Sequence, residues 1–123
     1  MNYWLDLFTG TTWKEFRTAG SRVSGFKHRM RKTGTEIKSG DILICYMTGV
    51  MRWVGALEVV GPSKDKTKIW TFDEFPVRFD VKPVIELEPE HGVPMIQLEG
   101  KVSWYRGPAD RGKFRRALRK KLQ

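Results

Sequence analysis

The order of apolar and polar positions predicts strands through the middle of the chain. Residues 42–47 are almost continuously apolar, which is typical of a strand buried on both faces. Residues 52–60 form a second apolar-rich segment after a short turn, and we expect the two segments to pair as a β-hairpin. Residues 77–82 alternate apolar and charged side chains, which indicates a half-exposed strand that continues past Pro83.

The N-terminal segment predicts a strand followed by a helix. Residues 2–8 are rich in aromatic and aliphatic side chains and lack a helical cap, so we expect a core strand. Thr12 and Glu15 have the spacing of a capping box, in which each side chain accepts a hydrogen bond from a free backbone N–H. We therefore expect a short helix over residues 13–19 that stops at Gly20.

Two basic stretches lie on either side of the strands predicted in the middle of the chain. Residues 21–34 are polar and basic, and they are predicted to be a surface loop or a loose helical turn. Residues 95–105 are ambiguous between a short helix and a strand. Asp110 is expected to cap a C-terminal helix, because the apolar residues after it recur at helical spacing while the other face carries Lys and Arg. About five strands with short helices at both ends predict a small closed or partly closed sheet.

Length and composition indicate one globular domain. The chain has 123 residues, 40% of them hydrophobic and 30% charged, so we interpret residues 1–123 as a single domain. No apolar run approaches the roughly 18 residues of a membrane helix, and the N-terminus lacks the apolar stretch of a signal peptide. Cys45 has no partner for a disulfide, which suits a reducing compartment. We expect a cytoplasmic protein.

The residues that usually carry catalysis or bind metal form no recognisable site in this sequence. A glycine-rich phosphate loop and a Gly-x-Ser-x-Gly elbow are both absent. Cys45 lies in the most apolar segment, where a thiol is far more often a core residue than a nucleophile. Cys45, His28 and His91 share no metal-ligand spacing. We therefore expect no enzymatic activity, no metal and no cofactor.

The distribution of charge points to a polyanionic partner. The chain has 23 Lys and Arg against 14 Asp and Glu, a net charge of +9. Residues 1–35 carry +5 (7 basic, 2 acidic), residues 36–100 carry −4 (7 and 11) and residues 101–123 carry +8 (9 and 1). Two basic ends that converge would form a nucleic-acid footprint. The alternative is a solubilising surface with a charged terminal helix.

Aromatic residues are interleaved with these cations. Phe, Trp and Tyr make up 12% of the chain. Trp13 opens the predicted helix, Phe26 lies in the basic loop, Trp53 begins a strand and Trp70 ends a charged loop. Unpaired bases need flat faces for stacking and cations for their phosphates, so the pattern favours nucleic-acid binding. For any single ring the alternative is a place in the core, which is our expectation for Trp4.

The chain also carries an ordered set of short motifs. They are Tyr3-Trp4-Leu5, Trp13, Ile37-Lys38-Ser39-Gly40-Asp41, Ile44-Cys45-Tyr46, Tyr46-Met47-Thr48-Gly49-Val50, Gly55-Ala56-Leu57-Glu58-Val59-Val60, Ile69-Trp70, Phe75-Pro76-Val77-Arg78 and Arg106-Gly107-Pro108. In this order and spacing the set resembles the EVE domain family over essentially the whole chain. No single motif is specific, but the ordered set is.

The resemblance implies both a fold and a function. EVE domains belong to the PUA-like superfamily, alongside YTH and ASCH domains. The implied fold is α+β, a PUA-like mixed β-barrel of about five to six strands with short peripheral helices that include the basic C-terminal helix. The implied function is to hold one extruded base in a pocket. In YTH relatives the pocket is an aromatic cage for a methylated adenine, and EVE members are associated with reading modified DNA bases, often within restriction systems.

Positions that match the family's motifs predict the site. Trp70 is similar to the cage aromatic that precedes the Phe-Pro-x-Arg strand, and Phe26 lies where many members have a Trp. Tyr46, Thr48 and Ser24 resemble the polar or shape-defining lining of the pocket. The predicted base pocket is Trp70, Phe26, Trp13, Tyr46, Thr48, Ser24 and Trp53, and the predicted phosphate contacts are Lys27, Arg29, Arg31, Arg52, Arg106 and Arg111.

The sequence thus favours a non-enzymatic reader of a modified base, with DNA or RNA as partner, within a larger restriction or RNA-processing assembly. The main alternative is an RNA-binding PUA-like module that does not require a modified base. A small hydrolase or nuclease is a third class, and it would need a convergent His, Lys or Glu constellation that the sequence does not show at recognisable spacing. A flipped base costs a few kcal/mol to unstack, which stacking between rings and hydrogen bonds to the base edge recover.

Overall fold

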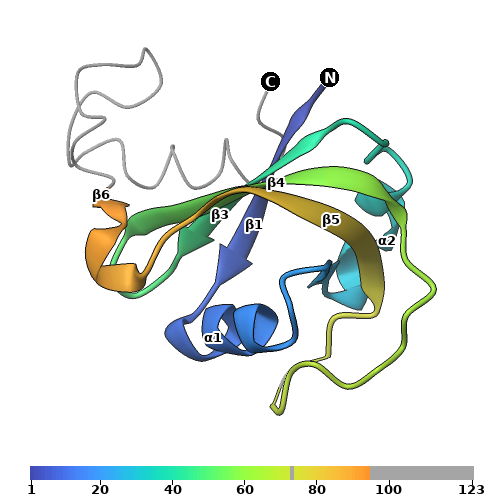
Figure 1. Ribbon diagram of the computed structural model, residues 1–123. Coiled ribbons are helices and arrows are strands. Elements are labelled where there is room, and N and C mark those ends of the chain that lie inside the picture. The colour runs from blue at the N-terminus through green and yellow to red at the C-terminus, as the bar shows by residue number, and fades with distance from the viewer. Residues whose placement is uncertain (73, 95–123) are drawn as a thin grey trace.

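The computed structural model of the chain describes residues 1–72 and 74–94 (Figure 1). The predicted C-terminal helix and the ambiguous segment 95–105 lie outside these residues. In chain order the elements are β1 (Tyr3–Phe8), α1 (Gly10–Thr18), β2 (Val23–Phe26), the 3-10 turn η1 (His28–Met30), α2 (Arg31–Gly34), β3 (Ile42–Met47), β4 (Arg52–Pro62), β5 (Val77–Glu86), the 3-10 turn η2 (Pro89–His91) and β6 (Val93–Pro94).

The strands form one mixed sheet that curls into a half-barrel. Its order is β1-β3-β4-β5-β2, and β6 pairs with β4 at the side of this path. β1 runs parallel to β3, and the other pairs are antiparallel. Figure 1 shows α1 packed beneath the curled sheet. The predicted α+β class, with a partly closed sheet of about five to six strands, is confirmed, and so is the hairpin formed by β3 and β4.

The prediction of a surface loop over residues 21–34 is wrong for its first part. Residues 23–26 form β2, a strand that is buried along its whole length and pairs with β5. The sequence conceals this strand because two of its four residues, Ser24 and Gly25, are neither apolar nor β-branched. Ser24 tolerates burial because its hydroxyl donates a hydrogen bond to the Asp6 carboxyl of β1.

Helix α1 begins earlier than the spacing of Thr12 and Glu15 predicts. The N-cap is Thr9, whose hydroxyl accepts from the backbone N–H of Thr12 at 3.1 Å. The Thr12 hydroxyl accepts in return from the backbone N–H of Thr9 at 2.8 Å, which completes a capping box with a threonine in the usual Glu position. Glu15 instead accepts hydrogen bonds from the backbone N–H and the hydroxyl of Thr71. Gly20 follows the helix with φ +102°, as expected for a helix stop.

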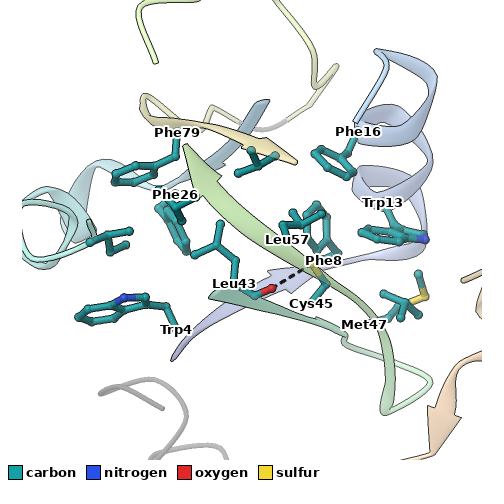
Figure 2. Close-up of a cluster of buried hydrophobic side chains, with 14 residues drawn as sticks. Trp4, Phe8, Trp13, Phe16, Phe26, Leu43, Cys45, Met47, Leu57 and Phe79 are labelled. Carbon is teal, nitrogen blue, oxygen red and sulfur yellow. Dashed lines mark hydrogen bonds between the residues drawn. The ribbon is translucent and has the colours of Figure 1, made fainter. Parts of the chain in front are cut away.

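Aromatic rings form much of the core between α1 and the sheet (Figure 2). The rings of Trp13 and Phe16 stack with centroids 5.5 Å apart, and the edge of Phe8 packs against Trp13 at 4.9 Å. The Trp13 indole N–H donates to the carbonyl oxygen of Leu87 at 3.1 Å. Cys45 lies in the same core, where burial raises the pKa of its thiol well above the usual value of 9.0. The core position expected for Cys45 is therefore confirmed, and the neutral thiol there is a poor nucleophile.

A buried carboxylate, Asp41, ties the N-terminus to the turn before β3. It accepts hydrogen bonds from the indole N–H of Trp4 at 2.9 Å and from the backbone N–H groups of Lys38 and Asn2 at 2.9 and 3.0 Å. Burial alone would raise the pKa of Asp41, but these bonds outweigh it and hold the pKa below its usual 3.8. Trp4 is 4% exposed, which confirms the expectation that it is a core residue.

Replacing Asp41 by alanine should lower the free energy of unfolding at neutral pH by about 1–3 kcal/mol, because three donors lose their acceptor. Because the folded-state pKa is depressed, the stability that Asp41 adds is present above about pH 4 and is lost as pH falls further. Urea unfolding would measure the free energy of unfolding of wild type and Asp41→Ala across this pH range. The difference between the two proteins should become smaller in acid. If the difference in free energy of unfolding does not depend on pH, Asp41 is not an ionised hydrogen-bond acceptor. Glu58→Ala, at an exposed strand position, is the control.

Among the described residues, no helix is both long enough and apolar enough to span a membrane. Within the same residues, no group of three or more His, Cys, Asp or Glu side chains is placed to hold a metal ion.

Candidate functional site

A cavity opens where the two edge strands of the sheet face each other. β1 and β2 end the strand order on opposite sides, and the half-barrel brings them together at a seam that the Ser24–Asp6 hydrogen bond bridges. The seam cavity has a volume of about 410 Å³, within the range of small-ligand pockets. It is lined by Leu5, Asp6, Leu7, Phe8, Thr9, Thr12, Gly25, Phe26, Lys27, Arg29, Met30, Thr48 and Phe75.

The unpaired edges of both strands face this seam. The carbonyl oxygens of Asn2 and Phe8 accept hydrogen bonds from the first residue of β3 and from the residue after β3, respectively. Along a parallel strand, the residues that bond one neighbour alternate with residues that point away from it. The backbone groups of Leu5 and Leu7 therefore point to the free edge of β1. The same argument applies to β2. The Val81 N–H donates to the Arg22 carbonyl, so every second residue from Arg22 bonds β5, and the backbone groups of Gly25 point away from β5. These N–H and C=O groups are available to the polar edge of a ligand.

Aromatic rings supply the apolar walls of the seam cavity. Phe26 comes from β2 and packs edge-on against Phe79 with centroids 6.0 Å apart. Phe75 comes from the loop before β5 and lies directly over Gly25. A Cβ atom at position 25 would lie 2.8 Å from both the Cβ and the carbonyl oxygen of Phe75, so only glycine allows this close approach.

One buried carboxyl group, Asp6, lies in the cavity wall. Asp6 is 1% exposed, and its Oδ2 accepts a hydrogen bond from the Ser24 hydroxyl. Burial raises the pKa of Asp6 to about 7, and the bond from Ser24 opposes this shift only in part. The uncharged polar side chains of the lining are threonines 9, 12 and 48, whose hydroxyls can both donate and accept.

Two cations lie at the seam cavity. Lys27 and Arg29 line the cavity and belong to the exposed segment 27–32, which carries a Lys or Arg at four of its six positions. Arg31 lies just beyond the lining, and its guanidinium approaches the His28 imidazole at 3.2 Å. Positive charge at the mouth of an apolar, aromatic cavity suits a planar ligand attached to an anionic backbone.

Four of the residues predicted to contact a nucleic acid line the seam cavity: Phe26, Thr48, Lys27 and Arg29. Ser24 contacts it indirectly, through its bond to Asp6. Arg52 lies elsewhere, because its guanidinium donates to the carbonyl oxygen of Pro89 at 2.9 Å. Arg106 and Arg111 lie outside the described residues, so their contacts stay predictions.

Four of the five aromatic residues predicted for the base pocket do not line the seam cavity: Trp13, Tyr46, Trp53 and Trp70. Trp13 is 1% exposed and belongs to the core under the sheet, so its side chain does not line the seam cavity. Tyr46 alternates along β3 with the core residues Cys45 and Met47, which places its side chain on the other face. There it packs against Trp53 with ring centroids 5.0 Å apart.

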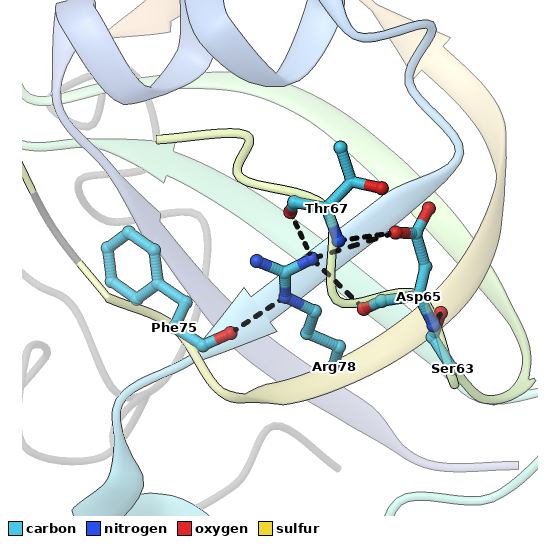
Figure 3. Close-up of polar contacts among 5 residues, drawn as sticks. All are labelled: Ser63, Asp65, Thr67, Phe75 and Arg78. Atoms are coloured by element: carbon cyan, nitrogen blue, oxygen red, sulfur yellow. Dashed lines mark hydrogen bonds and ion pairs between the residues drawn. The ribbon is translucent and has the colours of Figure 1, made fainter. Parts of the chain in front are cut away.

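Trp70 lies one layer behind the cavity wall. It is 3% exposed, its indole N–H donates to the carbonyl oxygen of Thr12 at 3.3 Å, and its ring packs edge-on against Phe75 at 4.9 Å. The guanidinium of Arg78 covers its ring at 5.4 Å and also holds the surrounding loop through the carbonyl oxygens of Asp65, Thr67 and Phe75 (Figure 3). In this structure Trp70 supports Phe75 instead of forming the wall itself.

Sequence reasoning missed the residues that define the seam. Asp6, Gly25 and Phe75 line it, and none was singled out for the pocket. Asp6 did carry a signal, because it is the one charged residue in the apolar run 2–8 and alternation places it on the same face as Trp4. Gly25 and Phe75 gave none, because their contact joins segments 50 residues apart.

Known proteins are similar to this chain in their fold. No protein-family model matches this sequence, and no curated protein matches it. Among solved structures, the YTH domain of Mmi1 in complex with RNA aligns with a TM-score of 0.56 at 13% identity, over 69% of this chain and 53% of that one. The chain has a YTH-like fold.

Two further YTH domains agree with this assignment. The Pho92 YTH domain in complex with m6A aligns with a TM-score of 0.53 at 19% identity, over 69% of this chain and 57% of that one. The YTH domain of Zygosaccharomyces rouxii MRB1 in complex with N6-methyladenosine RNA aligns with a TM-score of 0.54 at 12% identity, over 80% of this chain and 65% of that one. The alignment thus spans little more than half of the Mmi1 and Pho92 chains. These structural alignments show a YTH-like fold, while membership of the EVE family stays a prediction.

Proposed function

We propose that this protein is a non-enzymatic module that binds one extruded, modified base of a nucleic acid in the seam cavity. The observation that carries the proposal is the cavity itself, in which aromatic walls, unpaired strand edges and a cationic mouth converge. Each part matches one part of a nucleotide. Rings stack on the base, strand edges bond its polar rim, and Lys27 and Arg29 neutralise the neighbouring phosphates.

RNA is the first partner to test. The Mmi1 and MRB1 structures with this fold are complexes with RNA, and the MRB1 and Pho92 complexes contain N6-methyladenosine or m6A. A methyl group contributes only about 0.8 kcal/mol on burial, so a preference for the modified base also requires a closely fitting wall. Phe26 and Phe75 both line the seam cavity, which supports this role for their rings. Equal affinity for plain and modified RNA would instead favour an RNA-binding module with no modification requirement.

The proposal is tested by a binding screen with a matched pair of variants. Fluorescence anisotropy would compare single-stranded and duplex oligonucleotides of RNA and DNA that carry one plain or one methylated base. Phe26→Leu keeps an apolar side chain but removes the flat face, and should reduce the preference for the modified base by several-fold. Phe72→Ala, which removes an 87% exposed ring outside the cavity, should leave that ratio unchanged. Absence of binding to every oligonucleotide would overturn the proposal.

Salt should weaken binding steeply if the cationic mouth holds phosphates. On a single strand the slope of log affinity against log salt should be roughly −0.7 for each phosphate contact. Lys27→Gln and Arg29→Gln should each weaken binding to all sequences alike and make this slope shallower by about one contact. Lys82→Gln, at an exposed position of β5, is the control and should change neither quantity. If both cavity variants keep the wild-type slope of log affinity against log salt, Lys27 and Arg29 do not contact phosphates.

A further inference from the structure

The buried carboxyl of Asp6 is an unusual group for the wall of a cavity that has cations at its mouth. Asp6 lies in the middle of β1 and pairs with Cys45 of β3. Its neighbours on the same face, Trp4 and Phe8, belong to the hydrophobic core. An aspartate in such surroundings costs stability in its charged form, so its presence in the cavity wall calls for a function.

Among the described residues, one of the two oxygens of Asp6 has a hydrogen-bond partner. The Ser24 hydroxyl donates to Oδ2 across the seam, and within residues 1–72 and 74–94 Oδ1 has no hydrogen-bond partner. Asp6 also forms no ion pair in this part of the chain, since the ion pairs found there involve Arg17 and Arg78. A ligand in the seam cavity is therefore the available partner for Oδ1.

The surroundings of Asp6 keep its proton bound close to neutral pH. Burial raises its pKa to about 7. The titratable group facing it from β3 is the Cys45 thiol, whose own pKa is raised well above 9.0, so that group stays neutral. Lys27 and Arg29, at the mouth of the same cavity, are the charged groups on the β2 side, and α1 contributes only the uncharged Thr12 to the lining. Below its pKa, Asp6 is therefore a neutral acid with an O–H to donate.

The chemistry of such an acid selects among bases. With Oδ2 occupied by Ser24, the proton on Oδ1 can be donated to a ring nitrogen that carries a lone pair. Adenine and cytosine both present such a nitrogen next to an amino group, and a backbone carbonyl at the free edge of β1 can accept from that amino group. Uracil and thymine present an N–H at the equivalent ring position. They would face the Asp6 O–H with a second donor.

We propose that Asp6, in its protonated form, donates a hydrogen bond from Oδ1 to the ring nitrogen of an amino-bearing base, adenine or cytosine, held in the seam cavity. This inference rests on the proposed function and makes it more specific. It predicts that binding of these bases weakens as pH rises through neutrality. The ionised carboxylate would turn a lone pair toward the lone pair of the ring nitrogen.

The test uses the intact protein at two pH values, about 5.5 and about 8.5, on either side of the Asp6 pKa of about 7. Anisotropy would measure affinity for oligonucleotides with a central adenine or cytosine, methylated and plain, and for matched oligonucleotides with uracil or thymine. The affinity of wild type for the amino-bearing bases should fall by about tenfold at the higher pH relative to uracil or thymine. Asp6→Asn keeps a donor at every pH and should lose this pH dependence. Glu58→Gln, on an exposed part of β4, should behave as wild type.

The outcomes separate this inference from the proposed function. Binding with the same base preference at both pH values would overturn the role of Asp6 while leaving a base-binding module. A parallel pH dependence in wild type and Asp6→Asn would do the same, because the asparagine side chain does not titrate. Failure of every oligonucleotide to bind at either pH would remove both proposals.

A second measurement needs no variant and so does not depend on how Asp6→Asn folds. The carbon-13 shift of the Asp6 carboxyl would be followed from pH 5 to pH 9, with and without the preferred oligonucleotide. If Asp6 donates its proton to the base, binding stabilises the protonated form and moves the titration to higher pH. A titration that does not move when the oligonucleotide is bound would overturn the inference.

Discussion

Replacing Trp70 by alanine is expected to lower the free energy of unfolding by about 3–5 kcal/mol, the cost of removing a buried tryptophan from a packed site. The indole is 3% exposed, donates to the Thr12 carbonyl and packs against Phe75 and Arg78. Loss of these contacts should also loosen Phe75, because Trp70 lies behind this wall of the seam cavity. Urea unfolding measures the first effect, and the preference for a modified oligonucleotide measures the second.

Trp70→Phe separates packing from the hydrogen bond. It keeps a ring next to Phe75 but removes the N–H that reaches Thr12, so it should be less damaging than Trp70→Ala. One outcome for Trp70→Ala would support the direct role in the pocket that the resemblance predicts for Trp70. If Trp70→Ala stays nearly as stable as wild type and loses only the base preference, then Trp70 reaches the ligand when a base is bound.

Gly25→Ala is expected to damage the seam cavity more than its small size suggests. The new Cβ would meet the Cβ and the backbone carbonyl oxygen of Phe75 at 2.8 Å. Backbone atoms have little room to move aside, so β2 and the Phe75 loop must separate, at a cost of about 1–3 kcal/mol. We expect the affinity for the preferred oligonucleotide to fall by about tenfold or more, because Phe75 leaves its place as a wall of the cavity.

The matched control for this change is Gly61→Ala on β4. A Cβ at position 61 would meet nothing within 4 Å, so stability and affinity should stay close to those of wild type. Thermal unfolding would measure the stability of both variants, and anisotropy would measure their affinity for the oligonucleotide. Equal binding by Gly25→Ala and Gly61→Ala would show that the close approach of Phe75 to β2 is not required for the site.

Much of the sheet is predictable because its signals are local. The continuous apolar run of β3 and the alternation along β5 each reflect which faces of one strand are buried. The short β2 is different, since its burial depends on pairing with β5 and on the hydroxyl of Ser24 finding Asp6. Neither partner is near β2 in the sequence, and the segment therefore resembles a loop.

The site was predictable in part. The resemblance to the EVE family pointed to Phe26 and Thr48, and the run of cations pointed to Lys27 and Arg29, all of which line the seam cavity. The tryptophans were harder to place, because an indole suits a core and a stacking surface equally well. The side chain of Trp13 meets the sheet and that of Trp70 meets Phe75, contacts that no spacing along the chain reveals.

The net charge of +9 and the strands with clear periodicity can be read from the sequence alone. Which aromatic rings line the seam cavity and which lie only in the core depends on the tertiary structure. The tertiary structure also buries Asp6 beside the seam cavity and raises the pKa of its carboxyl to about 7. The physical reason is that burial and pKa depend on atoms from every element that surrounds a group. At the seam these elements are β1 and β2, which the curl of the whole sheet brings together.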